Sequence, residues 1–329
     1  MEFEFEKLIT QPEYKFFHND SRVKNLAYLT VSGSNAYGTN IEGSDLDLRG
    51  FVVENKDDLM LGTQLEVFEN RETDTVIYGF RKLISLLRDC NPSVVELFGT
   101  KPEHVLVSSV AGRMVRENID LFLTKKAFHS FAGYATAQLR RLQNALARED
   151  SYPAEEKQRH LRESIDVMMF TLKEHYQLDG GEFSFDTVGE GDETEVVVTV
   201  RADKMPLRKF SAVNSSLHTM VSNYDKLNHR NRKKDLPHLR KHAMHLVRLY
   251  LEGIDVLRGN GIQTFREKDV AMLRKIRFGE ISMDEVFAMA KNFEGEINEA
   301  FKSSPLPKEP DPEKVRKFML EVYRESGVY

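Results

Sequence analysis

Cysteine is almost absent from this chain, since Cys90 is the only one among 329 residues. A single cysteine excludes a disulfide framework and a cysteine-based zinc site, and it is typical of proteins from reducing compartments. No basic surroundings favour a reactive thiolate, so we expect Cys90 to be a small buried side chain.

Long apolar runs are missing as well. No stretch reaches the roughly 18 apolar residues of a membrane-spanning helix. Residues 1–6 are acidic and lack an apolar targeting segment. We therefore expect a cytoplasmic protein with no membrane partner. The net charge of −5 argues against a protein that coats nucleic acid over its whole surface, while leaving room for a local basic patch.

Three common sequence signatures are absent: the Walker lysine loop, the nucleophile elbow and the dinucleotide-binding glycine fingerprint. The composition is that of an ordinary globular protein, with 40% hydrophobic and 30% charged residues. This length accommodates one large domain or two ordinary domains with real cores.

The hydrophobic pattern changes near residue 106. Residues 1–106 alternate strand-like and helix-like segments, which predicts an α/β head, whereas residues 107–329 are mainly helical and carry a β-hairpin at about 182–201. We expect strands at 26–32, 45–48, 64–70 and 74–78, and helices at 79–88, 107–120, 124–148, 153–178, 206–225, 235–258, 266–277, 282–301 and 312–325. The sequence therefore predicts an α+β fold with two domains, 1–106 and 107–329.

Two aspartates one residue apart are the most informative feature of the head. Asp45 and Asp47 alternate with leucines, and at a period of two residues both carboxylates lie on one face of a strand. Two acids held so close repel each other unless a cation neutralises them. The pattern is compatible with a capped turn, a solvated strand face or a divalent-metal site.

Further residues extend the metal-site interpretation. Two-metal phosphate chemistry needs hard oxygen ligands, and Asp74, at the start of the next strand, is the natural third acid, with Glu72 as its competitor. Gly33 and Ser34 follow a strand, where a glycine lets phosphate approach the backbone and a hydroxyl can hold it. The order of these elements makes the combination more specific than any one of them.

The densest positive charge of this acidic chain lies at 226–242. It runs into a helix on which Lys241, His245 and Arg248 share one face, so these donors could neutralise a triphosphate; the alternative is a solvated basic face. We expect no zinc at His238, His242 and His245, because no cysteine or acid lies at ligand spacing beside them.

Two further side chains are ambiguous. Tyr37 could stack on a base or close its turn, and Arg49 could reach phosphate or form a salt bridge.

The order of strand, glycine-serine turn, paired aspartates and later acid resembles the DNA polymerase beta-type nucleotidyltransferases. Further segments resemble the RNA-repair-pathway polymerase-beta-like family, namely 32–39, 44–50, 91–97, 241–249 and 304–311. The resemblance implies a palm-like mixed sheet with flanking helices. It also implies that Asp45 and Asp47 bind two Mg²⁺ ions, with Mn²⁺ as a substitute, and that Asp74 is the third ligand. Gly33 and Ser34 would hold the triphosphate.

The resulting hypothesis is an enzyme, a nucleotidyltransferase that moves a nucleoside monophosphate from an NTP such as ATP to an acceptor hydroxyl and releases pyrophosphate. Family resemblance points to an RNA end, tRNA-like in kind, as the acceptor. Two alternatives remain. One is an NTP- or RNA-binding regulatory module with a degenerate head, although an intact acid triad speaks against it. The other is a nucleotidyltransferase of toxin–antitoxin type that modifies a protein or a small molecule.

Overall fold

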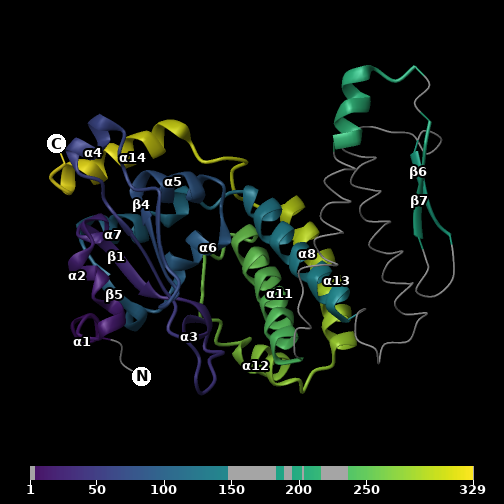
Figure 1. The fold of residues 1–329 in the computed structure, drawn as a ribbon, viewed down its shortest axis with the longest axis horizontal. Helices are drawn as coiled ribbons and strands as arrows, with labels where there is room; N and C mark the ends of the chain where they lie inside the picture. The colour runs from purple at the N-terminus through teal and green to yellow at the C-terminus, as the bar shows by residue number, and fades with distance from the viewer. Residues whose placement is uncertain (1–3, 147–182, 189–194, 202–203, 216–235, 329) are drawn as a thin grey trace. The chain divides into compact units, whose positions relative to one another are not determined.

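The computed structural model describes residues 4–146, 183–188, 195–201, 204–215 and 236–328 (Figure 1). The chain divides into two compact units. The first unit joins Met1–Gln138 to Arg240–Tyr329, and the second is Leu139–Leu239. The predicted boundary at residue 106 does not coincide with this division, because the C-terminal helices belong to the same unit as the N-terminal sheet.

A five-stranded mixed sheet forms the centre of the N-terminal head, in the order β3-β4-β2-β1-β5. Its strands are β1 (Leu26–Val31), β2 (Leu48–Val52), β3 (Val67–Asn70), β4 (Thr75–Gly79) and β5 (Val105–Ser108). Strand β1 pairs antiparallel with both β2 and β5, β3 pairs antiparallel with β4, and β2 and β4 run parallel. The strands predicted at 26–32, 64–70 and 74–78 are confirmed.

Two sequence predictions about this sheet are wrong. A strand, β5, stands where the sequence predicts the start of a helix at 107, because its short β-rich run pairs with β1. The helix itself, α7, spans Val110–Glu117. The second error concerns the paired aspartates, since β2 begins only at Leu48 and both acids lie in the segment that leads into it.

The two faces of the sheet carry different cores. On one face, Leu29, Leu48 and Ile77 pack with Leu8 and Phe17 from the N-terminal helices α1 (Phe5–Leu8) and α2 (Phe16–Asn19). The opposite face is aromatic, with ring contacts that link Tyr28, Phe51, Phe80, Phe98 and Tyr323. This division follows the period-two alternation of the strand sequences.

Helices fill the rest of the first unit (Figure 1). Beyond α1, α2 and α7 they are α3 (Gly33–Tyr37), α4 (Lys56–Leu61), α5 (Phe80–Arg88), α6 (Pro92–Val95), α8 (Lys126–Leu146), α11 (Leu236–Leu257), α12 (Val270–Phe278), α13 (Met283–Ser303) and α14 (Pro312–Glu325). Helices α8 and α11 also contribute residues to the second unit. Short 3₁₀ helices are Pro12–Tyr14, Ser21–Val23, η3 (Glu96–Gly99), Pro102–His104 and Ile119–Leu121.

Helices α8, α11 and α13 pack against one another. Phe128 of α8 stacks on Phe301 of α13 with ring centroids 4.5 Å apart. Gly253 of α11 lies so close to Phe131 and Ile297 that a Cβ there would be 2.8 Å from Phe131. The predicted helices 79–88, 124–148, 235–258, 266–277, 282–301 and 312–325 are confirmed to within a few residues. No helix in the described ranges combines the length and the apolar character needed to cross a bilayer.

The second unit contains a two-stranded antiparallel hairpin, β6 (Phe183–Val188) and β7 (Glu195–Val200). This confirms the hairpin predicted at about 182–201. Of the helix predicted at 206–225, residues 207–215 are described and are helical. The helix predicted at 153–178 and the basic segment at 226–235 lie outside the described residues.

Candidate active site

A glycine at the end of β1 gives one of the predicted aspartates its place. Gly33 begins α3 with a left-handed φ of +60°, which glycine adopts without steric penalty. A Cβ on Gly33 would lie 1.7 Å from Oδ2 of Asp47. The carboxylate therefore occupies the space that any other side chain would fill. Ser34, by contrast, is buried. The side chain that is predicted to contact phosphate is therefore not at the surface.

Backbone hydrogen bonds bring the two aspartate-bearing segments to one edge of the sheet. The Ser32 N–H donates to the carbonyl of Asp47 at 2.8 Å, and the Leu48 N–H donates to the carbonyl of Asp74 at 3.4 Å. Because β2 and β4 are parallel neighbours, their N-terminal ends meet at the same edge. Asp47 and Asp74 each stand directly before one of these strands, so the fold places them next to each other.

Asp45 is held differently from Asp47. Its carbonyl accepts a hydrogen bond from Nδ2 of Asn35 at 2.9 Å, and a turn precedes it in which the Ile41 N–H donates to Oγ of Ser44 at 2.9 Å. These contacts tie the segment to α3 rather than to a neighbouring strand, which is why the predicted strand at 45–48 does not form. The side chain of Asp45 is exposed.

The charges of the predicted site act on one carboxyl group. Burial raises the pKa of Asp47, and the negative charges of Asp74 and, more weakly, Asp45 raise it further. Arg49 and Lys241 act in the opposite direction on the pKa of Asp47. Five residues predicted from the sequence therefore share one electrostatic neighbourhood, and a cation beside Asp47 would favour its charged form.

The third acid is better assigned to Asp74 than to Glu72. Asp74 is the carboxylate that acts most strongly on the pKa of Asp47, and it takes a left-handed φ of 44° in the turn before β4. Aspartate is one of the few residues that adopt this conformation at modest cost. Glu72 is exposed in the same turn and borders a separate shallow pocket with Glu13 and Phe16.

The aspartates are nevertheless not arranged as a closed coordination site. Among the described residues, no group of three or more aspartate, glutamate, histidine or cysteine side chains could hold a metal ion. Asp45 and Asp74 are exposed and Asp47 is partly buried, and Asp74 acts on the pKa of Asp47 more strongly than Asp45 does. The convergence is thus looser than the sequence predicted. The donor chemistry still suits Mg²⁺, which prefers carboxylate oxygens and keeps several waters.

Two predicted nucleotide contacts are occupied within the protein. The Tyr37 hydroxyl donates to Oε2 of Glu96 at 2.6 Å. Arg248 donates from Nη1 to Oε1 of Glu96 at 2.8 Å and to Oε2 of Glu252 at 2.7 Å. Its guanidinium also lies 3.9 Å from the centroid of the Tyr37 ring. All four side chains are buried, and the contact of Tyr37 and Arg248 with a nucleotide stays a prediction.

Four side chains form this buried cluster: Tyr37, Glu96, Arg248 and Glu252. The cluster links separate elements of the fold. It joins α3 and η3 to α11. Lys241 lies two turns before Arg248 on α11; it is exposed, and its charge acts on Asp47. The cluster therefore holds Lys241 beside the aspartates. Sequence reasoning did not single out Glu96, although it belongs to the segment 91–97 that carries part of the family resemblance.

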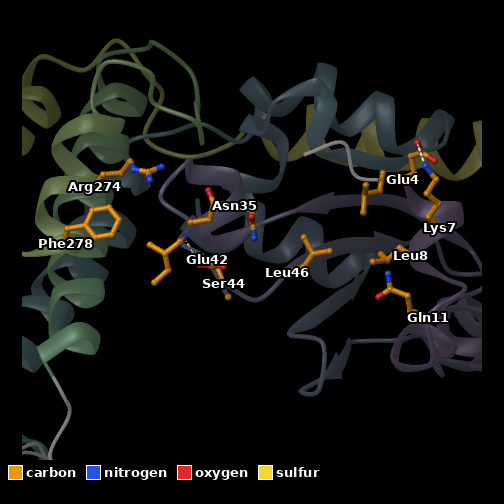
Figure 2. A pocket seen from close by; sticks show the side chains of 14 residues that line it. Glu4, Lys7, Leu8, Gln11, Asn35, Glu42, Ser44, Leu46, Arg274 and Phe278 are labelled. Carbon is orange, nitrogen blue, oxygen red and sulfur yellow. Dashed lines mark hydrogen bonds and ion pairs between the residues drawn. The ribbon is translucent and has the colours of Figure 1, made fainter.

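One groove of the first unit lies beside the segment that precedes β2 (Figure 2). It has a volume of about 910 Å³ and is bordered by α1, by the loop 40–46, and by Arg274 and Phe278 of α12. Ser44 and Leu46 border it, whereas Asp45 and Asp47 do not. The groove and the aspartates are thus on opposite sides of one extended segment.

The comparison with known families gives a match that spans the sheet and its aspartates. The matched class is the polymerase-beta-like proteins of RNA repair. Residues 9–169 match the model of the RNA repair pathway DNA polymerase beta family. The match confirms the family resemblance and includes Asp45, Asp47 and Asp74, while Lys241 and Arg248 lie outside it. No curated protein and no solved structure matches the chain.

Proposed function

We propose that this protein is a Mg²⁺-dependent nucleotidyltransferase that moves a nucleoside monophosphate from an NTP to a hydroxyl at an RNA end and releases pyrophosphate. One observation supports this most directly. The Asp47 carboxylate is lodged against the backbone of Gly33, beside Asp74, at the edge where β2 and β4 begin. The match to a polymerase-beta-like RNA repair family is consistent with a nucleotidyltransferase-type role.

Asp45, Asp47 and Asp74 would hold two Mg²⁺ ions, and Mn²⁺ would serve as a substitute. When bound, such ions lower the pKa of an attacking hydroxyl and offset the charge on the leaving pyrophosphate. The acceptor oxygen forms a bond to the α-phosphorus as the bond to the β-bridging oxygen breaks, and pyrophosphate leaves with that electron pair. The hydroxyl proton passes to the carboxylate of Asp74. Lys241 and Arg49 oppose the negative charge of the phosphates.

The test is a label-transfer assay with the full-length protein. Each α-labelled NTP is incubated with Mg²⁺, with Mn²⁺ or with EDTA, in the presence of bulk RNA, total protein or small hydroxylated metabolites. We expect label in the RNA pool with either ion and none with EDTA. Asp47→Asn should abolish transfer, whereas Asp57→Asn, which removes the same charge from the exposed first turn of α4, should not change it.

Other outcomes separate the alternatives. Label in protein or metabolites, with RNA unlabelled, would support nucleotidyl transfer but contradict RNA as the acceptor. No label in any pool, together with Mg²⁺ affinity that Asp47→Asn leaves unchanged, would contradict the enzyme proposal. RNA or NTP binding that persists in that case would favour a regulatory module.

A further inference from the structure

An arginine on α12 has no counter-charge within the part of the chain that the structure describes. Arg277 is half-buried, and its Nη1 atom is buried without a hydrogen-bond partner. Burial lowers the pKa of Arg277, and the like charge of Arg274, one turn away, lowers it further. Among the described residues no carboxylate forms an ion pair with Arg277.

Such a group is unusual because a guanidinium gives up hydration when it is buried and normally recovers the loss from an acid. The same protein balances Arg248 with two glutamates and Arg266 with two aspartates. A buried donor without a protein partner is a candidate contact for a water or for an anionic group from outside.

Positive charge continues from Arg277 toward the aspartates. Burial lowers the pKa of His245 well below its usual value, and the positive charges of Arg248, Lys241, His242 and, most weakly, Arg277 lower it further. Lys241 in turn acts on Asp47. The junction of α11 and α12 is therefore a basic path that leads to the predicted catalytic edge, in a chain whose net charge is −5.

An exposed aromatic side chain lies next to Arg274 and Arg277 on the same helix. Arg274 and Phe278 border the 910 Å³ groove together with Ile41 (Figure 2). The Phe278 side chain is 48% exposed, and the Arg274 guanidinium lies 5.7 Å from its ring centroid. At 100° per residue, Arg274 lies between Arg277 and Phe278 on one face of α12. An exposed ring flanked by arginines is what proteins use to stack a base beside its phosphate.

We propose that the α12 face formed by Arg277, Arg274 and Phe278 binds a single-stranded segment of RNA, with phosphates on the two arginines and an unpaired base stacked on Phe278. Arg274 and Phe278 border the groove, and the charge of Arg277 acts on His245 of α11. The role of the bound strand as the acceptor rests on the proposed function, but the binding itself does not require catalysis.

The experiment measures binding by fluorescence anisotropy with the full-length protein, in EDTA and without NTP, so that no transfer occurs. The probes are a labelled 12-nucleotide single strand, the corresponding duplex and labelled ATP. We expect Arg277→Gln, Arg274→Gln and Phe278→Ala each to weaken single-strand binding about tenfold. Arg277→Gln should also reduce the salt slope by about 0.7. The control Arg316→Gln removes an exposed charge on α14 and should change the affinity less than twofold.

A stability measurement distinguishes this role from a structural one. Because no carboxylate among the described residues pairs with Arg277, Arg277→Gln should leave the free energy of unfolding unchanged or raise it, and Arg277→Lys should restore part of the RNA affinity. Single-strand affinity within twofold of wild type in Arg277→Gln would overturn the proposal. It would equally be overturned if this variant lost only ATP binding, which would assign the anion to a triphosphate. If Asp47→Asn loses transfer but still binds RNA, the result concerns the proposed enzyme activity and leaves the RNA-binding proposal unaffected.

Discussion

Gly33→Ala tests whether the position of Asp47 matters for chemistry. The new methyl group would meet Oδ2 of Asp47 at 1.7 Å, so the carboxylate must retreat by about 1.7 Å to reach the 3.4 Å of ordinary contact. Misplacement of a reacting group by about 1 Å can lower a rate about 100-fold. We therefore expect nucleotidyl transfer to fall by about two orders of magnitude, with a comparable weakening of Mg²⁺ affinity.

The same substitution also strains the backbone, and this effect must be separated from the first. An alanine at a left-handed φ costs about 1–2 kcal/mol. Gly62→Ala is the matched control, because Gly62 ends α4 with φ +71° and a Cβ there meets nothing within 4 Å. Both variants should lose similar free energy of unfolding in a urea titration, but only Gly33→Ala should lose transfer. Equal transfer rates in the two variants would refute the link between Gly33 and Asp47.

Four further predictions concern the buried cluster, the basic helix and the cysteine. Arg248→Met should lower the free energy of unfolding by about 3–5 kcal/mol in urea, because it leaves Glu96 and Glu252 without a counter-charge. Burial raises the pKa of Glu252 well above its usual 4.5, so the folded state keeps this proton longer than the unfolded chain does. The resulting stability is complete below pH 4.5 and is lost as the pH rises, and Glu252→Gln should flatten this decline in urea titrations across pH. Lys241→Gln should raise the KM for NTP about tenfold without changing stability, because the side chain is exposed. Burial raises the pKa of Cys90 to about 11, so an aromatic disulfide reagent should leave the folded protein unmodified and react once the chain is unfolded.

The sequence predicted most of the regular elements because their patterns are strong and local. The strand at 26–32, the helix at 79–88 and the hairpin at 182–201 each show one clear period and ordinary end signals. The sequence did not predict strand β5, because four residues beside an amphipathic helix give too short a pattern. Only their pairing with β1 makes these residues a strand. The boundary between the two units was not predicted for a related reason. Helices α11 to α14 join the head through contacts between residues that are far apart in the sequence.

The site predictions also differ according to whether they depend on local sequence or on long-range contacts. The types and order of Gly33, Asp47 and Asp74 are local features, and the structure brings these residues together. The contacts of the helical body are not local. Arg248 has a basic side chain on a helix face, which suggests a phosphate contact, but its partners Glu96 and Glu252 become visible only after folding.

The buried cluster gives the family-like segments a shared physical role. Tyr37 belongs to the segment 32–39, Glu96 to 91–97 and Arg248 to 241–249, and the three side chains contact one another directly. A buried ion pair of this kind adds little net stability but strongly disfavours any arrangement that separates its members. The cluster therefore fixes one position of α11 against α3. Through that position it sets where Lys241 and the α12 face stand relative to Asp47.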